Sequence, residues 1–321
     1  MLGPSLPDHR AWYQHLILNW LQTALLLAVM AGLLALIGWI LWGGEGAFVL
    51  LAGSALAVLL APHISPSWIM RLYGARPLLP TQAPVLHYAL VELTRRAELS
   101  KVPRLYYFPS HIVNAFAVGN RQCAGIALSD GLLRRLNTRE VVAVLAHEVS
   151  HVRSNDLKVM ALADLLTRMT GIMAWFGWLF LFFSLPLAIL ADVKINWLIL
   201  PVLIFAPTLS ALAQLGLSRT REYDADLQAA RLSGDPEGLA RALIKIEQMQ
   251  GGWIERLFMP RRKTFLASLL RTHPTTEERV KRLMALPPVD PLYQALPVFS
   301  IPADIPPWRR RLFWWIRGPW L

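Results

Sequence analysis

Two histidines and a glutamate stand at the spacing of a metal-dependent hydrolase. The segment from His147 to His151 has the pattern H-E-x-x-H, with Glu148 in its second position. Residues four apart on a helix share one face, so the two imidazoles can point at a single ion. Such a site also needs a third protein ligand and an open position for water. Glu148, rotated by about 100° from His147 around the helix axis, would be the general base that takes a proton from that water.

Glu222 is the best candidate for the third ligand. It lies in the charged segment 219–226, which would otherwise be read as a solvated helix start. Of the 70 residues between His151 and Glu222, the 50 residues 169–218 have the composition of a membrane hairpin, so 20 remain to join two metal-bearing helices. Asp226 follows four residues later on the same helix face, where it can accept the other N–H of a ligating histidine. The sequence thus predicts one zinc ion per chain.

The composition requires membrane segments. Of the 321 residues, 55% are hydrophobic and 17% are charged, and the mean hydropathy is +0.41, whereas about a quarter of a soluble domain is charged. The single cysteine, Cys123, excludes an intrachain disulfide and a cysteine-built metal site. A net charge of +11 is better explained by basic residues beside anionic lipid than by a nucleic-acid partner. No nucleic-acid partner is expected.

Four stretches free of Asp, Glu, Lys and Arg are long enough to cross a bilayer as helices, although a buried core helix is the alternative for any one of them. The predicted spans are 16–42, 46–61, 170–190 and 196–214. They form two hairpins, with turns at 43–46 and 192–194. Only one of the 32 basic residues, Lys194, lies in these turns. The positive-inside rule then places both termini and the active site in the cytoplasm.

The remaining sequence predicts a mixture of helices and short strands. Strands are expected at 105–108, 114–118 and 125–128, with a hairpin turn at 119–122 between the last two. Asn137 followed by Glu140 has the form of a capping box, which marks the start of the helix that bears the H-E-x-x-H motif. Further helices are expected over 83–98, 217–232, 237–250 and 275–285.

The chain resembles the HtpX-type membrane zinc metalloproteases, relatives of the CAAX prenyl proteases, over roughly residues 15–285. Four motifs in order carry this resemblance. They are Asn114-Ala115-Phe116-Ala117-Val118-Gly119, the H-E-x-x-H segment followed by Ser154-Asn155-Asp156, the segment Arg219–Asp226, and Thr272-His273-Pro274 with Arg279.

This resemblance implies a mainly α membrane protein, with four transmembrane helices and a cytoplasmic α+β gluzincin-like zinc protease domain that contains a small antiparallel sheet. It implies zinc bound by His147, His151 and Glu222, with Glu148 catalytic. It also implies that Asn114, Ala115, Phe116 and Ala117 lie on an edge strand that binds substrate. His273 would donate to the oxyanion, Arg279 would brace His273 or the substrate, and Asp156 would support the site or cap a helix.

Five segments are expected along the chain. They are a transmembrane hairpin at 1–61, the first part of the catalytic domain at 62–168, a second hairpin at 169–218, the second part of the catalytic domain at 219–286, and a Trp/Arg-rich tail at 287–321 suited to a membrane interface.

The function expected from these features is zinc-dependent endopeptidase activity in a bacterial inner membrane. The substrates would be damaged or misassembled membrane proteins, as in stress-response quality control, and self-cleavage is expected on purification. Two alternatives stay open. One is CAAX-type processing of lipid-modified proteins, and the other is a non-catalytic membrane scaffold that keeps zinc for structure.

Overall fold

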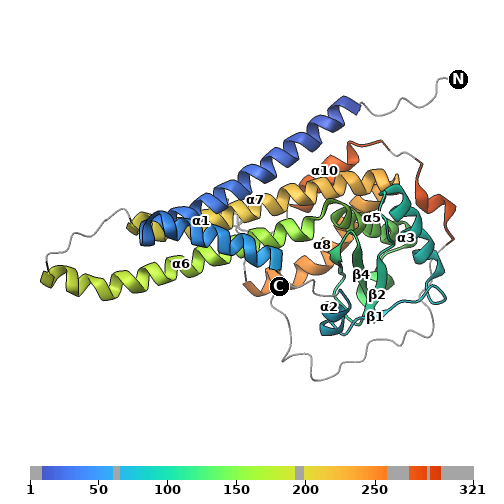
Figure 1. Cartoon of the computed structure of the whole chain (residues 1–321). Coiled ribbons are helices and arrows are strands. Elements are labelled where there is room, and N and C mark those ends of the chain that lie inside the picture. Colours follow the sequence, from blue (N-terminus) through green and yellow to red (C-terminus); the bar gives the residue numbers. More distant parts are fainter. Residues whose placement is uncertain (1–8, 61–65, 192–198, 259–274, 288–289, 298–321) are drawn as a thin grey trace. The chain divides into compact units, whose positions relative to one another are not determined.

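The computed structural model describes residues 9–60, 66–191, 199–258, 275–287 and 290–297, and it is mostly helical with one small sheet (Figure 1). The elements in chain order are α1 (His9–Leu60), α2 (Pro66–Leu72), β1 (Arg76–Pro77), α3 (Pro84–Arg96), β2 (Arg104–Phe108), β3 (Ala115–Asn120), β4 (Cys123–Ser129), α4 (Asp130–Arg135), α5 (Thr138–Ser154), α6 (Asp156–Ala191), α7 (Ile199–Ser233), α8 (Pro236–Phe258), α10 (Thr276–Met284) and the 3-10 helix η1 (Leu292–Ala295).

The chain folds into two compact units, and the division between them falls inside α7. The first unit contains α1, α6 and α7 as far as Asp224. The second contains α2 to α5, the sheet, the end of α7 from Ala225, α8, α10 and η1. Because α7 is one continuous helix with Pro207 inside it, the expected helix over 217–232 is its last part rather than a separate element. Apolar helices of this kind tolerate an internal proline.

Three described helices, α1, α6 and α7, are long and apolar enough to cross a membrane. They pack through a buried apolar cluster of Met30, Leu34, Ala163, Leu166, Ala213 and Leu217. Large apolar side chains point outward, including Trp20, Phe48 and Phe182, which are 69%, 72% and 74% exposed. Such a surface suits contact with lipid, because the exposure of this much apolar area to water is unfavourable.

Helix α1 turns back on itself at the predicted first turn. Gly43 has φ 72° and ψ −160°, outside the helical region and accessible to glycine. A Cβ added to Gly38 would lie 2.8 Å from the carbonyl oxygen of Gly46, although residues eight apart in a straight helix are separated by about 12 Å. The two halves of α1 therefore meet at these glycines, and the count of four spans stays a prediction.

The sheet is mixed, so the expected antiparallel sheet is wrong. Its strand order is β1-β2-β4-β3, and β2 pairs with β4 in parallel, whereas β1–β2 and β3–β4 are antiparallel. The predicted hairpin of β3 and β4 is confirmed. Its second strand, β4, lies between β3 and β2 in the sheet. The sequence indicates this central position of β4 by the continuous apolar run Ile126-Ala127-Leu128, which is fully buried. Strands covered on both faces are continuously apolar, whereas strands with one exposed face alternate.

The hairpin leaves β3 at one edge of the described sheet. Its turn is Arg121-Gln122, because Asn120 pairs with Cys123. The side-chain oxygen of Asn120 accepts hydrogen bonds from the backbone N–H groups of Gln122 and Cys123, at 2.9 and 3.0 Å. These bonds fix the end of the strand that the family resemblance assigns to substrate.

Candidate metal centre

Helix α5 presents the two histidines, and both of its ends are fixed locally. The predicted capping box is confirmed, since Asn137 Oδ1 accepts from Glu140 N–H at 2.9 Å and Glu140 Oε2 accepts from Asn137 N–H at 2.9 Å. At the other end, Asn155 adopts φ 54°, ψ 30°, a left-handed cap that stops the helix just after the motif. The helix is thus fixed at both ends, with His147 and His151 in its last turns.

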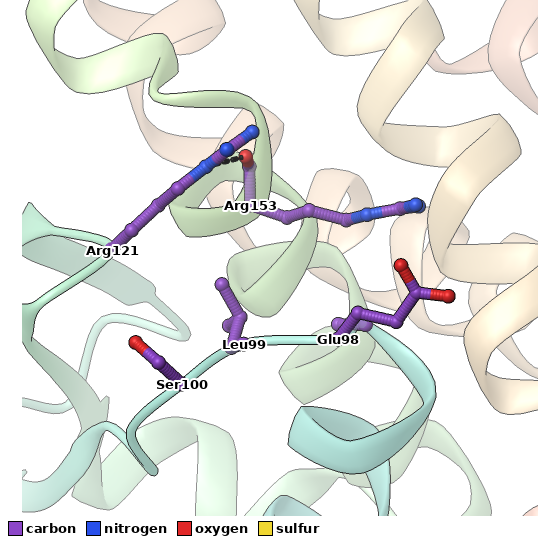
Figure 2. Close-up of a pocket in the computed structure, with 6 residues that line it drawn as sticks. Glu98, Leu99, Ser100, Arg121 and Arg153 are labelled. Atoms are coloured by element: carbon purple, nitrogen blue, oxygen red, sulfur yellow. Dashed lines mark hydrogen bonds between the residues drawn. The ribbon is translucent and has the colours of Figure 1, made fainter.

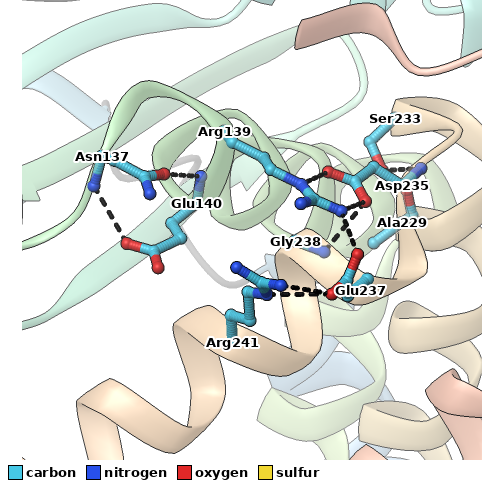
Figure 3. Close-up of polar contacts among 9 residues, drawn as sticks. All are labelled: Asn137, Arg139, Glu140, Ala229, Ser233, Asp235, Glu237, Gly238 and Arg241. Carbon is cyan, nitrogen blue, oxygen red and sulfur yellow. Dashed lines mark hydrogen bonds and ion pairs between the residues drawn. The ribbon is translucent and has the colours of Figure 1, made fainter.

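A network of charged residues ties the start of α5 to the start of α8 (Figure 3). Arg139 donates two hydrogen bonds to Asp235, at 2.6 and 2.7 Å, and a third to Glu237 at 2.7 Å. The bonds to Asp235 raise the pKa of Arg139 above its ordinary value; burial acts in the opposite direction, and the bond to Glu237 adds to the rise. Lys245 on α8 also donates to Glu140 at 2.8 Å. These pairs were not predicted, because each joins residues that lie far apart in the sequence.

The imidazoles of His147 and His151 converge. Their Nε2 atoms lie 3.1 Å apart, and the rings meet edge to face at 88°. Two zinc–nitrogen bonds at a tetrahedral angle would hold their nitrogens about 3.4 Å apart. The pair therefore fits two ligand positions on one ion.

Glu222 completes a possible metal-binding group. His147, His151 and Glu222 each offer one ligand atom, and these atoms lie within 4.8 Å of one another. Two imidazoles and one carboxylate form a donor set typical of catalytic zinc, which keeps a further position open. Glu148, next to the first histidine, is 8% exposed. The structure thus places the three predicted ligands in one possible metal-binding group, while the catalytic role of Glu148 stays a prediction.

Asp226 lies behind the first histidine, as its spacing from Glu222 predicts. Its Oδ1 atom is 3.1 Å from His147 Nδ1. The carboxylate is buried and accepts two hydrogen bonds from Arg279 on α10, at 2.7 and 2.6 Å. The guanidinium expected to brace His273 or the substrate is therefore engaged with Asp226.

Asp156 contacts the helix that carries Glu222. It begins α6 and accepts a hydrogen bond from Arg221 Nη1 at 3.1 Å. Arg221 also donates to the hydroxyl of Thr23 on α1 at 2.7 Å, and Asn19 on α1 donates to Asp224 at 3.4 Å. Sequence reasoning missed Asn19 and Thr23, although two polar residues one turn apart within a predicted membrane span are themselves a signal.

The other residues predicted to bind substrate lie in or beside β3, and the remaining predicted residues fall outside the described structure. Ala115, Phe116 and Ala117 belong to β3, where the Phe116 ring packs against Tyr73 and Phe108 at centroid distances of 4.8 and 5.4 Å. Asn114 precedes β3, and its N–H donates to the hydroxyl of Ser129 at 3.0 Å. His273 and the tail residues 298–321 lie outside the described residues.

A cavity of about 360 Å³ is lined by the hairpin turn and the end of α5, among other residues (Figure 2). It is lined by Ala97, Glu98, Leu99, Ser100, Arg121 and Arg153. Arg121 donates to the backbone carbonyl of Arg153 at 2.5 Å, which joins the hairpin turn to the end of α5. None of the predicted site residues lines it.

Comparisons with known proteins agree with this chemistry. The model of Peptidase family M48 matches residues 80–286. A protein named Protease HtpX homolog from Acaryochloris marina is 37% identical over 281 residues, covering 84% of this chain and 95% of its own. Protease HtpX from Legionella pneumophila is 34% identical over 284 residues, covering 84% of this chain and 100% of its own.

Among solved structures, the crystal structure of S. mikatae Ste24p matches with a TM-score of 0.48 and 22% identity, covering 84% of this chain and 67% of that one. The assignment rests on the family model and the relatives rather than on this likeness. The chain belongs to peptidase family M48 and is a membrane metalloprotease.

Proposed function

We propose that the chain is a zinc-dependent endopeptidase whose metal is held by His147, His151 and Glu222. The observation that carries this proposal is the convergence of these three ligand atoms within 4.8 Å. The family implies a metal, and the donor set fits zinc because two imidazoles and one carboxylate match its preference for nitrogen and oxygen ligands in an open site. The single cysteine, Cys123, is exposed and takes no part.

Zinc, when bound, polarises the scissile carbonyl and makes water more acidic. Glu148 accepts a proton from the attacking water and then gives a proton to the leaving amine. Its low exposure of 8% keeps the carboxylate largely out of bulk water.

Asp226 sets the tautomer of His147. The Asp226 carboxylate lies 3.1 Å from Nδ1, where it would hold the proton on that nitrogen and leave the lone pair of Nε2 free for the metal. Arg279 compensates the buried charge of Asp226 through two hydrogen bonds. In this role Arg279 acts on the metal ligand through Asp226.

The edge strand β3 is proposed to bind the substrate backbone through Asn114, Ala115, Phe116 and Ala117. An extended peptide can add to an unpaired strand edge by main-chain hydrogen bonds, with little demand on its side chains. Such tolerance suits the removal of damaged or misassembled membrane proteins in a bacterial inner membrane, with the active site on the cytoplasmic side. His273 is proposed to donate a hydrogen bond to the oxyanion of the reacting carbonyl.

The test is the Glu148→Gln variant, assayed with a model membrane protein substrate in detergent. We expect the variant to keep one zinc ion per chain, measured by elemental analysis, and to lose cleavage. Cleavage by the variant at the wild-type rate would refute the role of Glu148. Efficient cleavage of a prenylated peptide, with none of the unmodified membrane protein, would favour CAAX-type processing instead.

A further inference from the structure

Asn19, Gln22 and Thr23 are polar residues within a largely apolar stretch of helix α1. Asn19 and Thr23 lie one turn apart, and no charged residue occurs between Ala11 and Gly44. Polar groups within a membrane helix are costly unless they are hydrogen-bonded, and they commonly mark function. Thr23 is 5% exposed, so its hydroxyl needs partners inside the protein.

The Thr23 hydroxyl uses both its donor and its acceptor capacity. It donates to the backbone carbonyl of Asn19 at 2.8 Å and accepts from Arg221 Nη2 at 2.7 Å. Arg221 extends from α7 and donates in addition to Asp156 on α6 at 3.1 Å. With side-chain exposures of 13% for Arg221 and 4% for Asp156, this ion pair is largely shielded from water and held in one geometry.

These contacts lie on both sides of the third ligand. Arg221 immediately precedes Glu222, and Asp224, which accepts from Asn19 at 3.4 Å, follows it by two residues. A turn of helix that is bonded to α1 before and after one residue cannot rotate that residue freely. These contacts restrain the turn of α7 from which the Glu222 side chain extends.

We propose that Thr23, supported by Asn19, is a positioning residue for the metal site, and that α1 orients Glu222 through Arg221 and Asp224. The inference rests on the proposed role of Glu222 as a metal ligand. Its physical reason is that a ligand must be held within about 0.5 Å of its productive position by surrounding contacts. The apolar helix α1 would thus serve the chemistry as well as anchor the chain.

The experiment compares Thr23→Val, Thr23→Ser and Thr170→Val in the full chain. Valine has the shape of threonine without the hydroxyl, whereas serine keeps the hydroxyl. Thr170 is the matched control, because it is fully buried and its hydroxyl donates to the backbone carbonyl of Leu166 at 2.7 Å, with no hydrogen bond to a side chain among the described residues. The readouts are the zinc dissociation constant, kcat and KM at limiting and saturating zinc, and thermal unfolding at saturating zinc.

We expect Thr23→Val to weaken zinc binding about tenfold, the lower end of the effect of losing a supporting contact near a metal ligand. The kcat of this variant should fall at limiting zinc and recover at saturating zinc. Its KM should equal that of the wild type. Thr23→Ser and Thr170→Val should match the wild type.

Zinc affinity of Thr23→Val equal to that of the wild type would overturn the inference while the proposed function stands. Equal weakening by Thr170→Val would overturn it too, as would a Thr23→Val protein that does not fold at saturating zinc. A wild-type protein that neither binds zinc nor cleaves substrate would instead refute the proposed function itself.

Discussion

Arg279 and Asp226 form a buried, two-fold hydrogen-bonded ion pair, with distances of 2.7 and 2.6 Å and side-chain exposures of 9% and 6%. The pair joins α10 to the end of α7, directly behind His147. It connects the stability of the second unit to the orientation of a metal ligand.

Replacing Arg279 by methionine should therefore affect both stability and metal binding. The variant leaves Asp226 buried without its counter-charge, and breaking a buried pair on one side costs about 3–5 kcal/mol. Zinc affinity should fall about 10–100-fold, since the carboxylate no longer holds His147 in place. Thermal unfolding and zinc titration in detergent measure the two effects, and a variant with wild-type values for both would contradict this account.

The Arg139–Asp235 pair should contribute far more to the free energy of unfolding than an exposed ion pair of the same length. Asp235 is 2% exposed, so Arg139→Ala should destabilise the protein by about 3 kcal/mol or more. The control is Arg168→Ala, because Arg168 pairs with Asp164 at 2.7 Å with side-chain exposures of 66% and 46%. Exposed pairs contribute less than about 1 kcal/mol. Equal shifts in the unfolding temperature of the two variants would show that the network in Figure 3 does not fix the start of α5.

The glycines at the turn of α1 give a matched pair of substitutions. A Cβ at Gly38 would lie 2.8 Å from Gly46 O and 2.9 Å from a methyl group of Leu50, whereas one at Gly32 would meet nothing within 4 Å. Gly38→Ala should cost about 1–3 kcal/mol by overpacking, while Gly32→Ala should be neutral or stabilising by up to about 1 kcal/mol. Thermal unfolding measures the stability of both variants. A Gly38→Ala protein as stable as the wild type would argue against close contact between the two halves of α1.

The sequence predicts the local parts of this site better than the long-range ones. The spacing of His147 and His151, and the capping box of Asn137 and Glu140, follow from helix geometry within a few residues. The position of β4 beside β2 does not, because hairpin signals specify the pairing of β3 with β4 and leave the neighbour on the other side open. The residues around Thr23 were missed for a similar reason, since their partners lie about 200 residues away and only tertiary packing brings them together.

The most direct test of the central claim is X-ray absorption spectroscopy at the zinc edge on the purified full-length protein. The account predicts a single zinc environment with two imidazole nitrogens and carboxylate or water oxygens at about 2.0–2.2 Å, and Glu222→Gln should change the oxygen contribution while both imidazoles remain. Sulfur ligands, a shell without imidazole, or the same spectrum in Glu222→Gln would contradict it.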